Sequence, residues 1–161
     1  LMSWNKLGAD VDLRLRPPSC AGNATWHCTE DVYYFNTNPN WGDPNSADDD
    51  PLLYRDCVTT CTSEQITVDT IPDPGTYRVI AHYYRDHGLG ATHVTMEVFR
   101  RAKRVFEGGI NLSNVGDTPT GGDVWFAYDI VIPAPLAAPQ IVEVNRVVRG
   151  SGSPGRAPTK D

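Results

Sequence analysis

The chain has 161 residues, enough for one domain with a hydrophobic core, and no apolar run approaches the roughly 20 residues of a membrane-spanning helix. Its formal net charge of −6 argues against nucleic acid as a partner, because domains that bind nucleic acid present excess positive charge. Its 14 glycines and 13 prolines predict frequent turns and argue against long helices.

The first segment with a clear period is ADVDLRLRPP, at residues 9–18. Apolar and charged residues alternate along it, which predicts a half-buried strand that ends at the two prolines. One face carries Val11, Leu13 and Leu15, and the other carries Asp10, Asp12, Arg14 and Arg16. The aromatic and β-branched segment DVYYFN, at residues 31–36, predicts a second strand.

The remaining pattern is a series of short strands separated by turn residues. They are predicted at residues 65–70, 76–84, 91–100, 104–107, 123–133 and 140–148. In the strand at 123–133, the pattern places Val124, Phe126, Tyr128 and Ile130 on one face. Seven or eight short strands without a helix signal predict an all-β fold, an antiparallel β-sandwich. Residues 1–149 form its one domain, and the Gly-, Ser- and Pro-rich residues 150–161 are expected to be a flexible linker or tail.

All four cysteines, Cys20, Cys28, Cys57 and Cys61, lie in predicted loops. An even number of loop cysteines predicts disulfides and an oxidising compartment, and hence a secreted, periplasmic or cell-surface protein. Four thiolates also suit a zinc ion, but these spacings contain no C-x-x-C pair. Three pairings satisfy the sequence. We favour Cys20–Cys28 and Cys57–Cys61, since each closes a short local loop.

Residues 30–64 contain eight acidic residues and a single basic one, Arg55. Calcium takes about six to eight oxygen ligands, mostly carboxylates, amides and carbonyls, and a cation would relieve the repulsion between crowded carboxylates. The alternative is a solvated polar loop, because Asp, Asn and Pro are the usual turn formers. The candidate calcium ligands come from three segments: Asp10, Asp12, Asn38, Asp48, Asp49, Asp50, Asp56 and Glu64.

Aromatic residues also gather near the acidic segment, notably Tyr33, Trp41 and Tyr54. Exposed aromatic rings stack on sugars or anchor protein partners, so a carbohydrate-binding module for a surface glycan is a second hypothesis. The alternative is that these rings cover the inner side of the loop as a small satellite core.

The sequence lacks three common catalytic motifs. The chain has no G-x-S-x-G elbow, no H-E-x-x-H and no Gly-rich phosphate loop, so we expect a non-catalytic protein. An uncharacterised hydrolase stays as a third hypothesis, which a glycosidase and esterase screen would test. The basic turn FRRAKR, at residues 99–104, is predicted to be a solvated hairpin tip whose charges discourage edge pairing.

Five stretches in order resemble one family: ADVDLRL, YYFNTNPNWG, DDDPLLYRD, EQITVDTIPDPGTYRVIAHYYRDHG and DVWFAYDI. They are similar to the DUF2135, or YfaP-like, domains of bacterial surface proteins, especially large ones from myxobacteria. The resemblance covers roughly residues 3–132. It implies a β-sandwich outside the cytoplasm, one module of a larger surface or secreted protein with a structural or binding role.

The chain departs from this family after the D-D-P turn. Such domains usually continue with an acidic, glycine-rich stretch, whereas this chain reads LLYRDCVTTCTSE. Asp56 and Glu64 match acidic positions of the family, while Cys57 stands where an acid is expected. The departure implies fewer calcium ligands, and a Cys57–Cys61 disulfide that holds the loop shape which a metal or the glycines would otherwise set.

Overall fold

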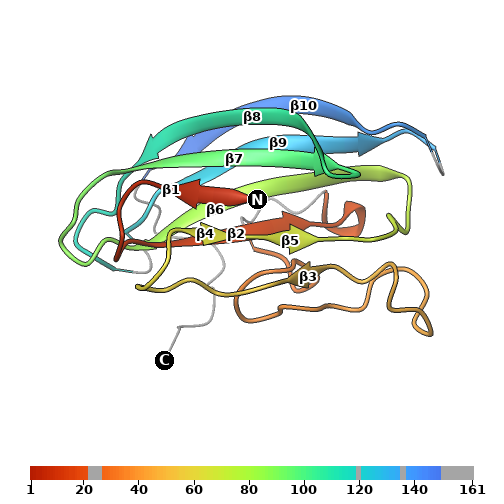
Figure 1. Cartoon of the computed structure of the whole chain (residues 1–161), viewed down its shortest axis with the longest axis horizontal. Helices are drawn as coiled ribbons and strands as arrows, with labels where there is room; N and C mark the ends of the chain where they lie inside the picture. Colours follow the sequence, from red (N-terminus) through yellow and green to blue (C-terminus); the bar gives the residue numbers. More distant parts are fainter. Residues whose placement is uncertain (22–26, 119–120, 135–136, 150–161) are drawn as a thin grey trace.

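The computed structural model describes residues 1–21, 27–118, 121–134 and 137–149, and within them the chain is an all-β sandwich (Figure 1). Two four-stranded antiparallel sheets pack against each other, so the predicted fold class is confirmed. Among the described residues, no helix is long and apolar enough to cross a membrane. The predicted tail at residues 150–161 lies outside the described residues.

The first sheet, which we call sheet A, has the strand order β4-β1-β7-β8. Its strands are β4 (Ser63–Glu64), β1 (Met2–Trp4), β7 (Thr92–Arg100) and β8 (Lys103–Leu112). The N-terminal strand β1 is therefore interior, with Met2 opposite Glu64 on one side and Met96 on the other. A separate pair of short strands, β3 (Leu52–Leu53) and β5 (Ile66–Thr67), lies beside the sandwich (Figure 1).

The second sheet, sheet B, has the order β10-β9-β6-β2. Its strands are β10 (Gln140–Val148), β9 (Val124–Ile132), β6 (Gly75–Arg85) and β2 (Asp10–Arg16). A 3-10 turn, η1 (Pro18–Cys20), follows β2. The inner faces of both sheets form one core, to which sheet A contributes Met2, Val94 and Met96 and sheet B contributes Val11, Leu13, Tyr77, Ala81 and Trp125.

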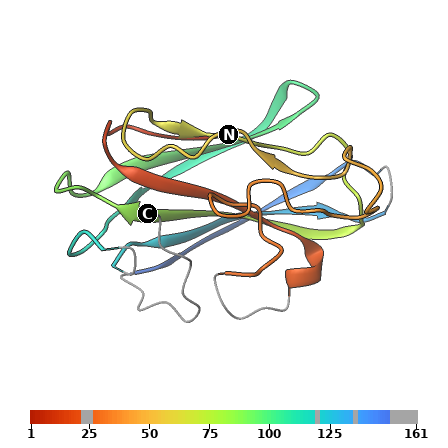
Figure 2. The same cartoon turned by 90° about the horizontal axis from the view of Figure 1, so that it is seen from below.

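Strand β2 differs from its prediction, because all seven of its residues are buried rather than one face alone. The apolar residues point into the core, as the alternation requires. The charged residues lie on the outer face of sheet B, where Asp31 contacts Arg14 and Arg16, and Asp56 approaches Asp10 and Asp12. Figure 2 shows the orange segment that follows residue 26 beside β2, and the bridge between Leu15 and Val32 attaches it there.

Residues 31–36 do not form the predicted strand. They make isolated bridges, between Leu15 and Val32 and between Tyr33 and Asn36, so the segment is a tight turn seated on β2. The predicted strand at 104–107 is longer than expected and continues to Leu112, whereas the one at 65–70 shrinks to β5.

Strand β9 contains a bulge that alternation alone does not reveal. Its register with β6 shifts between the Val79–Tyr128 and Ile80–Phe126 pairs, which leaves Ala127 without an opposite residue. As a result the four residues predicted on one face divide between two faces. Tyr128 and Ile130 pack in the main core, whereas Val124 and Phe126 form a second cluster with Ile80.

The hairpin that joins β7 to β8 has a two-residue turn with an unusual backbone. Arg100 pairs with Lys103, and the intervening Arg101 and Ala102 have φ angles of 48° and 61°. Two positive φ angles are typical of a type I′ turn, which favours Asn-Gly. For a residue with a Cβ atom, this left-handed conformation is less favourable by roughly 1–2 kcal/mol of free energy.

We therefore expect the double substitution R101N/A102G to raise the free energy of unfolding by about 1 kcal/mol, measured by urea denaturation. As a control, Ala47 is exposed and has no positive φ. The A47G variant should be less stable by about 0.5 kcal/mol, since glycine there only adds freedom to the unfolded chain. Equal effects of the two changes would show that the turn carries no backbone strain.

Candidate functional site

Three of the predicted calcium ligands converge in the structure. Asp10, Asp12 and Asp56 each offer a carboxylate oxygen, and these oxygens all lie within 4.8 Å of one another. Asp10 and Asp12 are buried, with 1% and 0% of their surfaces exposed, and Asp56 is half-buried. We call these residues the aspartate cluster. Carboxylates that are both crowded and removed from water repel one another strongly, so this arrangement needs nearby positive charge.

The strand period explains the first two members of the cluster. Asp10 and Asp12 are two residues apart on β2, so both side chains project from the outer face of sheet B. Asp56 arrives from a distant part of the sequence, in the loop between β3 and β4. The cluster therefore forms where the loop meets the edge strand of sheet B.

Glu64 holds these two segments together through its carboxylate. One oxygen accepts a hydrogen bond of 2.7 Å from the backbone N–H of Leu13, and the other accepts one of 2.9 Å from the N–H of Cys57. These amides directly follow Asp12 and Asp56 in the sequence. Glu64 is itself only 2% exposed, so it fixes the cluster's geometry as a buried acceptor of backbone amides.

The cluster also contacts the side chain of His82. This residue lies directly opposite Asp12 on β6, and its Nδ1 is 3.5 Å from the Asp12 carboxylate. His82 is 2% exposed. The sequence alternation could not identify this contact, because it depends on the register between β2 and β6.

Farther along the same face, Arg14 and Arg16 share one counter-ion, Asp31. The Asp31 carboxylate accepts hydrogen bonds from Arg14 Nη1 at 3.2 Å and from Arg16 Nε at 3.1 Å, and all three side chains are almost fully buried. Burial lowers the pKa of Arg14, while the nearby Asp31 charge acts in the opposite direction. The His27 ring contacts Arg14 Nη1 at 2.6 Å, and burial together with the Arg14 charge lowers the pKa of His27.

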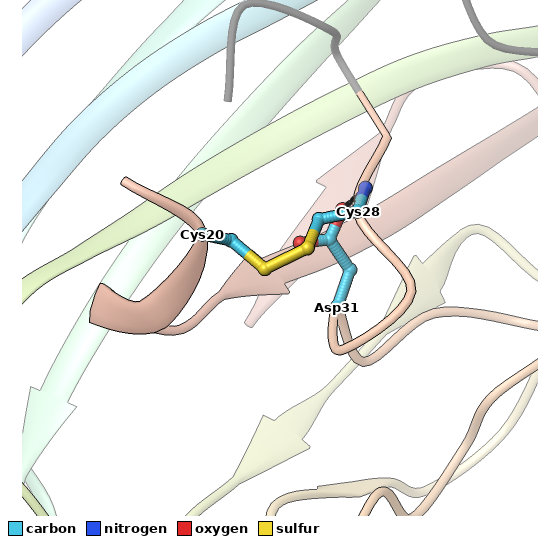
Figure 3. Close-up of side chains that lie close together, drawn as sticks. All are labelled: Cys20, Cys28 and Asp31. Atoms are coloured by element: carbon cyan, nitrogen blue, oxygen red, sulfur yellow. Dashed lines mark hydrogen bonds between the residues drawn. A yellow bond between two sulfur atoms is a disulfide. The ribbon is translucent and has the colours of Figure 1, made fainter. Parts of the chain in front are cut away.

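Asp31 also lies against a disulfide. Figure 3 shows Asp31 beside Cys20 and Cys28, whose sulfur atoms are joined. The Asp31 carboxylate accepts a hydrogen bond of 2.9 Å from the backbone N–H of Cys28. Although this group has the composition of a metal site, its sulfurs are already bonded to each other and are not thiolate ligands.

The second disulfide joins Cys57 to Cys61, so the favoured pairing of all four cysteines is confirmed. No cysteine is left free to bind zinc. The Cys57–Cys61 bond closes the loop that begins immediately after Asp56, and Cys57 is fully buried. It thus constrains the loop that supplies the third carboxylate of the cluster.

The other predicted calcium ligands lie elsewhere, within the long loop itself. Asp49 and Asp50 accept hydrogen bonds of 2.8 Å from the backbone N–H groups of Asp43 and Trp41. The Asn38 side chain donates to the carbonyl of Pro51, and Asp48 is exposed. Among the described residues, no group of His, Cys, Asp and Glu side chains that could hold a metal ion contains Asp48, Asp49 or Asp50. The acidic run serves mainly to hold the shape of its own loop.

The predicted aromatic ligand-binding residues are not on one surface. Trp41 is 5% exposed, donates its indole N–H to the carbonyl of Glu30 and packs against Tyr77. Tyr33 is 3% exposed, and the Arg14 guanidinium lies 4.1 Å from its ring centre. Tyr54 is 74% exposed. Two of the three rings therefore serve as the inner cover of the loop and offer no open face to a sugar.

No protein-family model, no curated protein and no solved structure matches the chain, so the likeness to DUF2135 domains stays a prediction from sequence.

Proposed function

We propose that this protein is a non-catalytic module of a larger surface or secreted protein, and that calcium bound at the aspartate cluster stabilises it. The observation that carries the proposal is the convergence of three carboxylates, two of them almost wholly buried, at the contact between β2 and the loop that precedes β4. A cation there would attach the loop to the sheet. The two disulfides support an oxidising compartment outside the cytoplasm.

The chemistry of the donors fits calcium better than a softer metal. Asp10, Asp12 and Asp56 offer oxygen only, and no free cysteine is present. Hard oxygen ligands suit calcium and magnesium, and calcium tolerates an irregular arrangement that combines carboxylates from a strand and a loop.

The test is thermal unfolding of the oxidised protein with excess calcium and with a chelator. Because the cation binds the folded state, we expect a stabilisation of about 2.7 kcal/mol when free calcium is a hundred times its dissociation constant. The D12N variant should lose this calcium response, because it removes one of the two buried charges in the cluster.

The matched control is D48N. It makes the same chemical change at an exposed acid that lies outside the cluster, and it should keep the full calcium response. Two outcomes contradict the proposal: a wild-type protein whose unfolding temperature ignores millimolar calcium, or a response that D48N removes and D12N keeps. The second outcome would move the site into the acidic run.

A further inference from the structure

A groove of about 680 Å³ opens between the two sheets, and none of its lining residues belongs to the aspartate cluster. Sheet B contributes one wall, which includes Leu13, Leu15 and Val79, and strand β7 of sheet A contributes Met96 and Val98 to the other. Protein interiors are normally packed without voids of this size. Its volume lies within the range of about 300–1,000 Å³ that is typical of small-molecule sites.

The walls of the groove are apolar and recessed. Leu13, Val79 and Met96 are at most 6% exposed, while Val98 and Ile66 are half-buried nearer the opening. Water gains few hydrogen bonds against such walls, so filling the groove with hydrocarbon is favourable. Because these side chains are recessed between the sheets, a flat bilayer surface cannot reach them, whereas a single flexible hydrocarbon chain can.

The opening carries a basic turn. Arg101 and Ala102 of the β7–β8 hairpin line the groove, and Arg100 and Lys103 flank them. Of the two acidic lining residues, Glu97 pairs with Arg104 at 2.8 Å, and Asp69 is exposed. Within the described part of the chain, Arg100, Arg101 and Lys103 form no ion pair, so the turn adds positive charge to the mouth.

The turn is also the place where two side-chain-bearing residues adopt positive φ angles. A protein that needed only a hairpin here would be more stable with Asn-Gly. Backbone strain of this kind collects where a side chain must be presented in a particular place. Here the strained residue Arg101 presents its charge at the rim of an apolar groove.

We propose that the groove binds one molecule of a long-chain fatty acid, with its hydrocarbon chain between the sheets and its carboxylate at Arg101. The apolar walls match the chain, and the basic mouth matches the anion. This site shares no residue with the aspartate cluster, so it stands independently of the proposed calcium function.

Isothermal titration calorimetry of the whole chain with palmitate tests the proposal. We expect saturable binding of one palmitate per chain with a micromolar dissociation constant. Hexadecyltrimethylammonium, which has the same tail length and a cationic head, should bind more weakly. Val98→Trp should abolish palmitate binding by filling the groove, while circular dichroism checks that this variant remains folded.

Two charge reversals provide the decisive comparison. Arg101→Glu should weaken palmitate binding about five- to tenfold, as expected for the loss and reversal of one partly exposed ion pair. Lys103→Glu makes the same change of charge two residues away, outside the groove lining, and should weaken it by less than about twofold. Neither variant should alter the calcium response.

Three results would overturn the proposal. The first is no saturable palmitate binding by the wild-type protein, including the case in which only anionic vesicles bind. The second is equal affinity for the cationic amphiphile, which would remove the role of Arg101. The third is undiminished binding by a folded V98W variant, which would place the fatty acid elsewhere.

Discussion

Replacing Asp31 with Asn should lower the free energy of unfolding by about 3–5 kcal/mol, the largest effect that we expect from a single substitution. Asp31 is the shared counter-ion of Arg14 and Arg16, and all three side chains are almost fully buried. Asn has nearly the same shape but carries no charge, so both guanidiniums would stay in the interior without their anion. Urea denaturation, with circular dichroism as the readout, measures the loss.

A second Arg–Asp pair in the same sheet provides the control. Arg78 and Asp129 form hydrogen bonds of 2.7 and 2.8 Å, but their side chains are 29% and 15% exposed. Water can replace Asp129 there, so D129N should lower the free energy of unfolding by about 1 kcal/mol. If D31N costs no more than D129N, solvent reaches Arg14 and Arg16, and the buried ion cluster is not a main support of the loop.

The second large effect is expected at Glu64. Its two carboxylate oxygens accept hydrogen bonds from the buried backbone N–H groups of Leu13 and Cys57. In E64Q, one oxygen becomes an NH₂ group that faces one of these amides, which loses its acceptor. A buried amide without a partner costs about 1–3 kcal/mol, and the repulsive contact adds to it, so we expect a loss of about 3 kcal/mol in urea denaturation.

Glu107→Gln is the matched control for this change. Glu107 is an exposed partner of Arg104 on β8. The E107Q substitution should therefore change the free energy of unfolding by about 0.5 kcal/mol or less. E64Q should also weaken the calcium response, since Glu64 joins the segments that carry Asp12 and Asp56. A stable E64Q protein with an unchanged calcium response would show that Glu64 does not position the aspartate cluster.

Much of the sandwich could be predicted because each strand bears a local signal. The alternation in β2 identifies its core face, and the Pro-Asp-Pro-Gly turn marks the start of β6. What the sequence could not reveal is the covering of the other face. The Arg14–Asp31 pair depends on a loop that folds back over β2, and a charged face with such a cover looks the same in sequence as a solvated one.

The bulge in β9 is a second feature that the sequence pattern could not predict. One extra residue at Ala127 reverses the facing of every later side chain, so Phe126 and Tyr128 point to opposite sides although they are two residues apart. Bulges arise from pairing with the neighbouring strand, here β6. A rule that uses the period of one strand cannot detect them.

The candidate calcium ligands could likewise be predicted only in part from the sequence. All three members of the aspartate cluster were among the predicted ligands, because their residue types are those that calcium prefers. Asp10 and Asp12 share a face by strand geometry, but the approach of Asp56 requires the tertiary fold. The Asp48–Asp50 run was predicted to bind calcium because its three carboxylates are consecutive. In the structure, Asp49 and Asp50 instead accept hydrogen bonds from backbone N–H groups of their own loop.

The interior position of β1 in sheet A affects how the chain can fold as it is synthesised. Met2 pairs with Glu64 on one side and with Met96 on the other. β1 is synthesised before both of its partners, and Met96 follows Met2 only 94 residues later. Until β7 has been synthesised, the edge of β1 that pairs with it stays open, and the core that Met2 and Trp4 help to fill stays incomplete. Pairings so distant in sequence close slowly, so assembly of sheet A should be a late step that follows release of β7.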